Sequence, residues 1–437
     1  MPMLVHGWRC AVCGAARPVA DTFPWRCPRW TPHDVHHVLH IVSDPLEGGG
    51  ATSTGGDERD ESPFLTHDRR LAWAAHAAAH GIDVDGRAGM VDELDAAIAA
   101  VAGTGFRPTP FARSAELSDA LGFGDTGGVW VKDETGNVAG SHKARHLVTI
   151  LLHLLAAERL GLIDDRPPLA ISSCGNAALA AATLARAARW PIDVFVPTWM
   201  SDAFGRRLDA LGARIHRCER RSGDPAGDPA MLRFREAVAA GAVPFTVQGT
   251  ENGLCLDGGR TIGWEIGALV ALPRGPGRID RVFAQVGGGA FAACLGRALA
   301  EMGHRAPLVA VQAEGCAPLV RAWDRSRGVA TLAELGERWG ELMTPWRRPT
   351  SMADGILDDE AYDWLGVLDV VRRSGGRAVT VGEGSIERAQ QMAVAAGFAA
   401  SPTGAAGLAG LLATRTGIGD DERVVVAMTG VDHPEQG

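Results

Sequence analysis

Long apolar runs and lysine are both scarce in this chain. The most apolar stretch, Leu147 to Ala157, is interrupted by His153 and is too short to cross a bilayer. The first ten residues, MPMLVHGWRC, lack a charged segment followed by an apolar core, which is the usual form of a secretion signal. We therefore expect a cytoplasmic protein that does not bind membranes. Only two of the 43 basic residues are lysines, Lys132 and Lys143, and the others are arginines.

Excess positive charge and a cysteine framework are also missing. The 43 basic residues are outnumbered by 52 acidic ones, for a net charge of −9, which argues against nucleic acid as a partner. The eight cysteines are scattered over 437 residues, so we expect reduced thiols rather than the disulfides of a small secreted domain. With 46% hydrophobic residues, the chain is long enough for two or three domains, and an enzyme acting on a small molecule is the default expectation.

Residues 1–43 resemble part of a zinc ribbon. They contain Cys10, Cys13 and Cys27, but Trp30 stands where a second cysteine pair would be completed. A closed metal site would need a histidine such as His33 as its fourth ligand. The incomplete pattern favours a degenerate ribbon without metal, and we do not expect zinc there.

Composition divides the rest of the chain into three parts. Residues 44–62 are rich in Gly, Ser, Thr and acidic residues and predict a flexible linker. Residues 63–106 predict helices that end at glycines, and residues 107–437 predict the catalytic body, with a smaller subdomain at about 140–250.

In the catalytic body, short runs of Val, Ile and Phe alternate with alanine-rich helical stretches. The runs are apolar at successive positions, which indicates parallel strands buried on both faces, and therefore an α/β fold with helices on each side of a sheet. The predicted strands are 129–132, 169–173, 192–197, 214–218, 281–286, 307–312 and 423–429. Ligands of such folds bind at the carboxyl ends of the strands.

Lys143 follows the first of these strands, in the segment GSHKAR at 140–145. We expect it in the first turn of a helix and in apolar company, and both effects disfavour its ammonium form. A neutral lysine amine can bond to an aldehyde carbon. The alternative is an ordinary surface lysine.

Three further segments follow predicted strands and have suitable chemistry for binding a ligand. Ser173 to Asn176 offer backbone N–H groups and polar side chains at the start of a helix, although a simple capping turn is the alternative. Gly287, Gly288 and Gly289 followed by Ala290 can close around a phosphate without side chains in the way. Thr429 places a hydroxyl after the last strand, where a plain turn is equally consistent with the residues.

Taken in this order, the segments resemble the fold type II pyridoxal-phosphate enzymes, which include threonine synthase, threonine and serine dehydratases, cysteine synthase and the tryptophan synthase β chain. The resemblance spans roughly residues 107–430 and implies two three-layer αβα domains with mostly parallel sheets. Stretches such as LDGGRTIGWEI at 256–266, SMADGI at 351–356 and SPTGAAGLAGL at 401–411 are most similar to threonine synthase.

The resemblance also implies roles for individual residues. Lys143 matches the lysine that bonds the cofactor aldehyde, Asn176 the partner of the cofactor's 3-hydroxyl, and Thr429 the partner of its ring nitrogen. Gly287, Gly288, Gly289 and Ala290 match the phosphate loop, and Ser173, Cys174 and Gly175 the loop that holds the substrate carboxylate. For a phosphorylated substrate, Arg145, His142 and His146 are the nearest candidates for a second anion site; the alternative for Arg145 is an ion pair with Asp133 or Glu134.

The implied function is a lyase that performs elimination or replacement at Cβ or Cγ of a small L-amino acid, in the manner of threonine synthase. Because a hydroxyl at position 429 stabilises a protonated ring nitrogen less than a carboxylate would, elimination and replacement are favoured over transamination. Alternatives are a threonine or serine ammonia-lyase, a cysteine synthase-like enzyme, a non-catalytic binding protein on the same fold, and a dinucleotide-dependent oxidoreductase. Two residues depart from the threonine synthase pattern: His142, directly before Lys143, and Cys174. They leave the identity of the substrate open. We also expect a homodimer.

Overall fold

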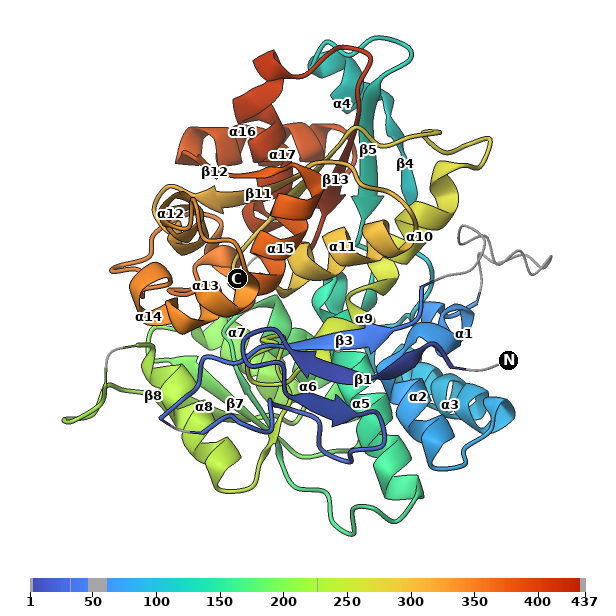
Figure 1. Cartoon of the computed structure of the whole chain (residues 1–437), viewed down its shortest axis with the longest axis vertical. Helices are drawn as coiled ribbons and strands as arrows, with labels where there is room; N and C mark the ends of the chain where they lie inside the picture. Colours follow the sequence, from blue (N-terminus) through green and yellow to red (C-terminus); the bar gives the residue numbers. More distant parts are fainter. Residues whose placement is uncertain (1–2, 32, 46–60, 226, 433–437) are drawn as a thin grey trace.

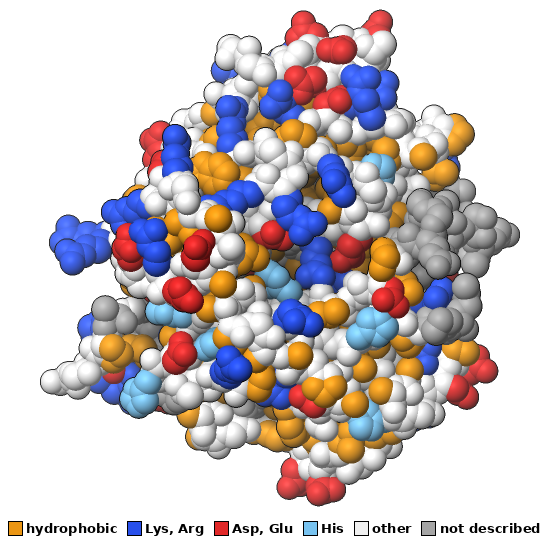
Figure 2. Space-filling model, in the orientation of Figure 1, with side chains coloured by type: hydrophobic (Ala, Val, Ile, Leu, Met, Phe, Trp, Pro, Cys, Tyr) orange, Lys and Arg blue, Asp and Glu red, His pale blue; other side chains and the backbone are white. Residues whose placement is uncertain are grey.

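The computed structural model describes residues 3–31, 33–45, 61–225 and 227–432 (Figure 1). Most of the predicted linker, residues 46–60, therefore lies outside the described residues. Within the described parts, no helix is both long enough and apolar enough to span a membrane. Figure 2 shows acidic and basic side chains interspersed over one face of the molecule.

The described residues among the first 43 build a small antiparallel sheet. Its strands, in the order β2-β1-β3, are β1 (Val5–Cys10), β2 (Ala16–Pro18) and β3 (Leu39–Ser43). Trp8 and Ile41 are directly paired across β1 and β3, and both are buried against the rest of the chain. The sheet lies across the front of the molecule in Figure 1 and packs on helix α2 (Ala72–Ala79).

The predicted helices of residues 63–106 form as α1 (Pro63–Thr66), α2 and α3 (Val84–Ala102). Gly103 ends α3 in the left-handed conformation, with φ of 78°, which a residue with a Cβ adopts only at a cost. Helix α3 packs on α6, so this region covers the outer face of the smaller lobe.

The smaller lobe surrounds a four-stranded parallel sheet in the order β8-β7-β6-β9. Its strands are β6 (Leu169–Ser172), β7 (Ile192–Pro197), β8 (Arg214–Cys218) and β9 (Val243–Pro244). Its helices are α5 (Lys143–Arg159), α6 (Asn176–Ala188), α7 (Asp202–Ala210) and α8 (Pro229–Ala239). Helix α8 packs directly on β6 and β7, while α5 and α6 pack on one another.

The larger lobe surrounds a six-stranded sheet in the order β12-β11-β10-β13-β5-β4, in which only β4 runs antiparallel to its neighbour. Its strands are β4 (Phe111–Ser114), β5 (Gly128–Asp133), β10 (Arg281–Gln285), β11 (Leu308–Ala313), β12 (Arg377–Val381) and β13 (Arg423–Met428). Alternate residues of β10 and β13 enter two separate apolar cores: Val282 and Val425 lie in one core, and Phe283 and Val424 in the other. The sheet is therefore buried on both faces, as the continuous apolar runs predict.

Helices α16 (Glu383–Ala395) and α17 (Pro402–Thr414) cover one face of the larger sheet, and α10 (Thr261–Val270), α11 (Ala290–Glu301) and α15 (Trp364–Ser374) the other. The shorter elements are α4 (Ala115–Ala120), α9 (Cys255–Gly258), α12 (Pro318–Arg325), α13 (Leu332–Glu337), α14 (Trp339–Leu342), and the 3₁₀ turns η1 (Asp68–Arg70), η2 (Val138–Gly140), η3 (Asp354–Ile356) and η4 (Arg415–Gly417). The predicted fold class, an α/β protein with two layered, mostly parallel sheets, is confirmed.

Candidate active site

One cavity of about 2290 Å³ lies where strands of both sheets reach their carboxyl ends. It is lined by every residue predicted to hold the cofactor and by the predicted substrate loop: Lys143, Ser173, Cys174, Gly175, Asn176, Gly287, Gly288, Gly289, Ala290 and Thr429. Four segments that are far apart in the sequence thus meet in one place, as expected for ligand sites of parallel α/β sheets.

Lys143 is the first residue of α5, and the loop before it is attached to the end of β13. Val431 N–H donates to the Gly140 carbonyl at 2.9 Å, and His142 N–H donates to the Thr429 carbonyl at 3.0 Å. Within this loop Ala139 has φ of 55°, an uncommon conformation for a residue other than glycine. The backbone around the lysine is therefore fixed relative to Thr429.

Burial lowers the pKa of the Lys143 amine below its ordinary value, and the Asp358 and Asp363 carboxylates act in the opposite direction. A lower pKa increases the fraction of neutral amine, which is the nucleophilic form. Lys132, the other lysine, is also buried, but its Nζ bonds Glu265 and donates to the Thr109 carbonyl at 2.7 Å, outside the cavity. Of the two lysines, only Lys143 faces the predicted cofactor site.

The prediction that Arg145 binds substrate is wrong. Its side chain is fully buried, and its Nε donates to Glu134 at 2.8 Å while Nη1 donates to Glu265 at 2.5 Å. Arg145 is not part of the cavity wall. The ion pair with Glu134, which was the alternative, is present. Through Glu134 and Glu265, Arg145 joins the start of α5 to the end of β5 and to α10.

The two histidines beside Lys143 also fail as anion ligands. Burial lowers the pKa of His146 to about 3, and its Nδ1 lies 2.8 Å from the Cys255 carbonyl, away from the cavity. His142 does line the cavity, but burial and the neighbouring Lys143 lower its pKa well below the usual value. Both rings are therefore neutral near pH 7, and His142 packs against Phe291 with ring centroids 4.8 Å apart.

The glycine loop has the form of an anion cradle. Gly289 has φ of 102° and begins the twelve-residue helix α11, whose first N–H groups have no partners within the helix. A Cβ on Gly287 would lie 2.5 Å from Asp358 Oδ2, so a larger residue would collide with the wall of the cavity. The Gly288 N–H donates to the Asp358 carboxylate, which shows that the loop presents a donor to an anionic group. The residues present fit the phosphate of pyridoxal phosphate.

Thr429 and Asn176 complete the predicted cofactor set. The Thr429 hydroxyl accepts a hydrogen bond from Gln285 Nε2 at 2.6 Å, and the same amide donates to the Gly404 carbonyl at 3.1 Å. Gln285 ends β10, so it holds the position of the hydroxyl relative to the glycine loop. Asn176 is the first residue of α6 and lies beside Gly430, where an added Cβ would be 2.8 Å from Asn176 Nδ2.

The sequence did not predict the carboxylates of the cavity. Asp228, Asp354, Asp358, Asp359 and Asp432 all line it. Burial raises the pKa of Asp358 to about 6, although Lys143 opposes this effect, and burial raises the pKa of Asp363, which lies behind the loop, to about 7. Three of the five lining carboxylates lie in the SMADGI stretch or just after it, but no motif there marks them as part of a site.

Cys174 stands in the predicted substrate loop, on the side of the cavity that faces these carboxylates. Burial, together with the charges of Asp354, Asp228 and Asp358, raises the pKa of its thiol to about 11. The thiol is therefore protonated near pH 7. The cavity wall carries arginines as well as carboxylates: Arg206, Arg207, Arg220, Arg321, Arg347 and Arg348.

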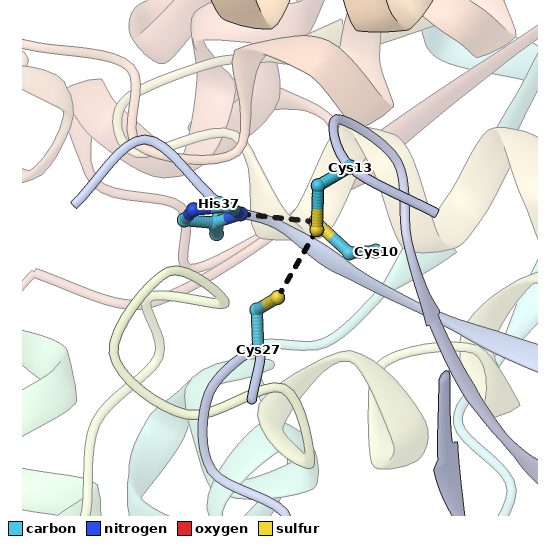
Figure 3. A group of neighbouring side chains, drawn as sticks. All are labelled: Cys10, Cys13, Cys27 and His37. Atoms are coloured by element: carbon cyan, nitrogen blue, oxygen red, sulfur yellow. Dashed lines mark hydrogen bonds between the residues drawn. The ribbon is translucent and has the colours of Figure 1, made fainter. Parts of the chain in front are cut away.

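The N-terminal cysteines come together, but with a different histidine from the one predicted. Cys10, Cys13 and Cys27 lie beside His37, as Figure 3 shows, whereas His33 is exposed and is not part of the group. The prediction of His33 as the fourth member is wrong, because the chain turns back into β3 and brings the buried His37 to Cys10.

The family profile described as "Pyridoxal-phosphate dependent enzyme" matches residues 103–430, which is most of the chain. This chain belongs to that family. It is therefore a pyridoxal-phosphate-dependent enzyme of fold type II, as the resemblance implied.

Solved structures with a similar fold cover most of the chain. Threonine deaminase isoform 2 from Solanum lycopersicum is 19% identical, with 80% of this chain and 86% of that chain covered and a TM-score of 0.59. Diaminopropionate ammonia lyase from Escherichia coli is 16% identical, with 79% and 88% covered and a TM-score of 0.61. Maize serine racemase is 18% identical, with 79% and 94% covered and a TM-score of 0.55. At these identities the likeness shows the fold alone. No curated protein matches the sequence.

Proposed function

We propose that this enzyme is a lyase that removes a side-chain substituent from a small α-amino acid and releases ammonia. The observation that carries the proposal is the position of Lys143, whose amine has a lowered pKa and lines the same cavity as the glycine loop, Asn176 and Thr429. When bound, pyridoxal phosphate withdraws electrons from Cα of an attached amino acid and makes the Cα proton acidic.

The residues of the chain then have distinct tasks. The Gly287 to Ala290 loop binds the phosphate through backbone N–H groups, and the Asn176 amide and Thr429 hydroxyl orient the ring. The Lys143 amine would hold the cofactor through its aldehyde, and its Nζ would accept the Cα proton of a bound substrate. The backbone of Ser173 to Gly175, at the start of α6, binds the substrate carboxylate.

Thr429 favours elimination over transamination. Its hydroxyl oxygen already accepts a hydrogen bond from Gln285, so the hydroxyl proton is directed toward another group. The hydroxyl also carries no negative charge that would stabilise a protonated ring nitrogen. A weaker electron sink favours early loss of a side-chain leaving group over reactions that need a long-lived carbanion.

A second candidate is an amino acid that carries another amino group. The carboxylates of Asp228, Asp354 and Asp358 act on the Cys174 thiol, so a cationic side chain placed beside Cys174 would be attracted to them. Among the proteins of similar fold, the one from Escherichia coli is a diaminopropionate ammonia lyase, whose reaction is of this class. The threonine synthase-like reaction predicted from the sequence, with loss of phosphate at Cγ, would instead need the arginines of the cavity wall to bind the phosphate.

Borohydride reduction tests the role of Lys143 directly. The reductant fixes the cofactor on the lysine that holds it, and because the chain has only two lysines, a peptide mass map separates Lys143 from Lys132. We expect the label on Lys143 alone, and we expect Lys143→Ala to lose the visible absorbance of the bound cofactor. Label on Lys132, or an unchanged spectrum in the variant, would contradict the proposal.

A substrate panel then identifies the reaction. L-serine, L-threonine, 2,3-diaminopropionate, O-acetylserine and O-phosphohomoserine are tested for release of 2-oxo acid, ammonia and phosphate. Oxo acid with ammonia from serine or threonine supports the first candidate, and a preference for diaminopropionate supports the second. Phosphate release with threonine as product would instead support the threonine synthase-like reaction.

A further inference from the structure

Three cysteines and one histidine form a compact group outside the active site. Cys10 ends β1, Cys13 lies in the turn that follows, and Cys27 and His37 lie on the segment before β3. Their sulfur and nitrogen atoms all lie within 4.8 Å of one another. Cys13 Sγ is 3.5 Å from Cys27 Sγ, and Cys10 Sγ is 3.4 Å from His37 Nδ1 (Figure 3).

These distances are those between neighbouring ligands of a tetrahedral zinc ion. Zinc bonds of about 2.3 Å to sulfur and about 2.0 Å to nitrogen place adjacent donors roughly 3.5–3.8 Å apart. Three thiols and an imidazole are one of the common structural zinc sets. Cys10, Cys27 and His37 are also buried, so the group is inside the protein rather than on its surface.

The surroundings of the group support thiolate and imidazole ligands. Arg29 N–H points at Cys27 Sγ at 3.4 Å, and Ala15 N–H bonds Cys13 Sγ. Each of these two sulfurs therefore accepts a hydrogen bond from the backbone N–H of the residue two positions later. His37 Nε2 lies 3.2 Å from an Asp34 oxygen, which leaves Nδ1 directed at the cysteines. A carboxylate on the far nitrogen is the usual partner of a histidine that binds a metal.

We propose that Cys10, Cys13, Cys27 and His37 bind one structural zinc ion. Four protein ligands close the tetrahedron and leave no position for substrate or water, so the ion has no catalytic role. The three thiols lose their protons when the ion binds, and the resulting thiolates bond the metal.

The ion fixes a segment that connects the two lobes. Next to His37, His36 stacks on Trp339 of the larger lobe with ring centroids 5.1 Å apart and planes inclined by only 2°. Near Cys27, the Trp25 carbonyl accepts from Gly253 N–H at 2.8 Å, and Arg26 pairs with the buried Glu251. By holding Cys27 and His37 in place, zinc positions both contacts at once.

Metal content of the purified full-length chain, without a histidine tag, is the first test. We expect about one zinc per chain, and we expect Cys13→Ser and Cys27→Ser to lose most of it. The matched controls are Cys218→Ser, in β8, and His33→Ala, in the same segment, and both should keep the zinc. Zinc retained in both ligand variants, or lost in either control, would contradict the assignment.

Cobalt provides a second readout that does not depend on the variants. After reduction and removal of zinc, the wild-type chain should bind Co²⁺ with the near-ultraviolet absorption of thiolate coordination. The rival arrangement is a disulfide between Cys13 and Cys27, whose formation needs an external oxidant. A purified chain without zinc that also gives no cobalt band after reduction would overturn the proposal, whether or not a disulfide is found.

Discussion

At the scale of single residues, the buried charges around Arg145 matter more for stability than for catalysis. The guanidinium holds Glu134 and Glu265 together, and Lys132 also bonds Glu265. Arg145→Met would leave two buried carboxylates with too few partners, because Lys132 alone cannot pair with both. Loss of one member of a buried ion pair costs about 3–5 kcal/mol, and we expect a decrease of that size in the free energy of unfolding.

Urea denaturation measures this effect. Arg206→Met serves as the control, because Arg206 is exposed at the cavity and its loss should change the stability by less than about 0.5 kcal/mol. If Arg145→Met is as stable as wild type but has a strongly raised KM, Arg145 contacts substrate after all, and the arrangement described above is not the functional one.

Asp363 predicts a dependence of stability on pH. Its pKa is raised by burial to about 7 in the folded chain, from an ordinary value of 3.8. Between these two values the folded chain keeps a proton that the unfolded chain has lost, so the contribution of Asp363 to stability is complete below pH 4 and is lost as the pH rises toward 7. Asp363→Asn should keep the acceptor for Gly249 N–H and remove this dependence.

The measurement compares wild type and Asp363→Asn by urea denaturation at pH 5 and pH 7.5. We expect wild type to lose more stability than the variant between the two values. Equal losses in both proteins would show that Asp363 is ionised in the folded chain at pH 5.

At the scale of elements, the turn from β10 into α11 has a conformation that only glycine adopts easily. Gly289 has φ of 102°, and an added Cβ would lie 3.1 Å from Val367 Cγ2. Gly289→Ala therefore strains the loop by about 1–3 kcal/mol. Because the loop is the expected phosphate site, we expect affinity for pyridoxal phosphate to fall about tenfold or more.

Equilibrium dialysis of the cofactor-free protein measures that affinity. Gly384→Ala is a matched control, since Gly384 lies in α16 with nothing within 4 Å of an added Cβ. The control should bind the cofactor as wild type does. Wild-type affinity in Gly289→Ala would mean that the loop does not bind the phosphate.

Elements with a strong local pattern could be predicted from the sequence. The strands β7 and β13 are apolar at nearly every position because helices cover both sheet faces, and their predicted limits agree with the structure to within a residue. Strand β12 was missed because it is an edge strand, and RAVTV is only partly buried. Strand β9 is too short, with two residues, to give any pattern.

The site residues that directly follow a strongly patterned strand could also be predicted from the sequence. Lys143 and the glycine loop directly follow strong strands, so their meeting at one sheet edge follows from the parallel topology. Asp358 could not be predicted, because it reaches the cavity from an irregular segment that only tertiary packing fixes. The choice of His37 over His33 depends on how the chain enters β3, which spacing alone does not show.

At the scale of the whole molecule, the N-terminal segment behaves as a connection between lobes rather than as a separate domain. The Thr22 carbonyl accepts a hydrogen bond from His153 Nε2 of α5 at 2.7 Å, and His36 stacks on Trp339 of α14. Arg297 of α11 donates to the Ile41 carbonyl in β3. The N-terminal segment therefore contacts helices of both lobes, although its residues precede the catalytic body in sequence.

A chain that begins at residue 46 tests this role. Removing the small sheet exposes Trp73 and the apolar face of α2 and leaves His153 without its carbonyl partner, so we expect the melting temperature to fall by about 5 °C or more. Hydrogen exchange should become faster in both α5 and α14, since each loses a contact. The control is Phe23→Ala in the full chain, because Phe23 is 47% exposed and its loss should change neither measurement. Faster exchange in α5 alone would mean that the segment stabilises only the smaller lobe, and an unchanged melting temperature would mean that it stabilises neither.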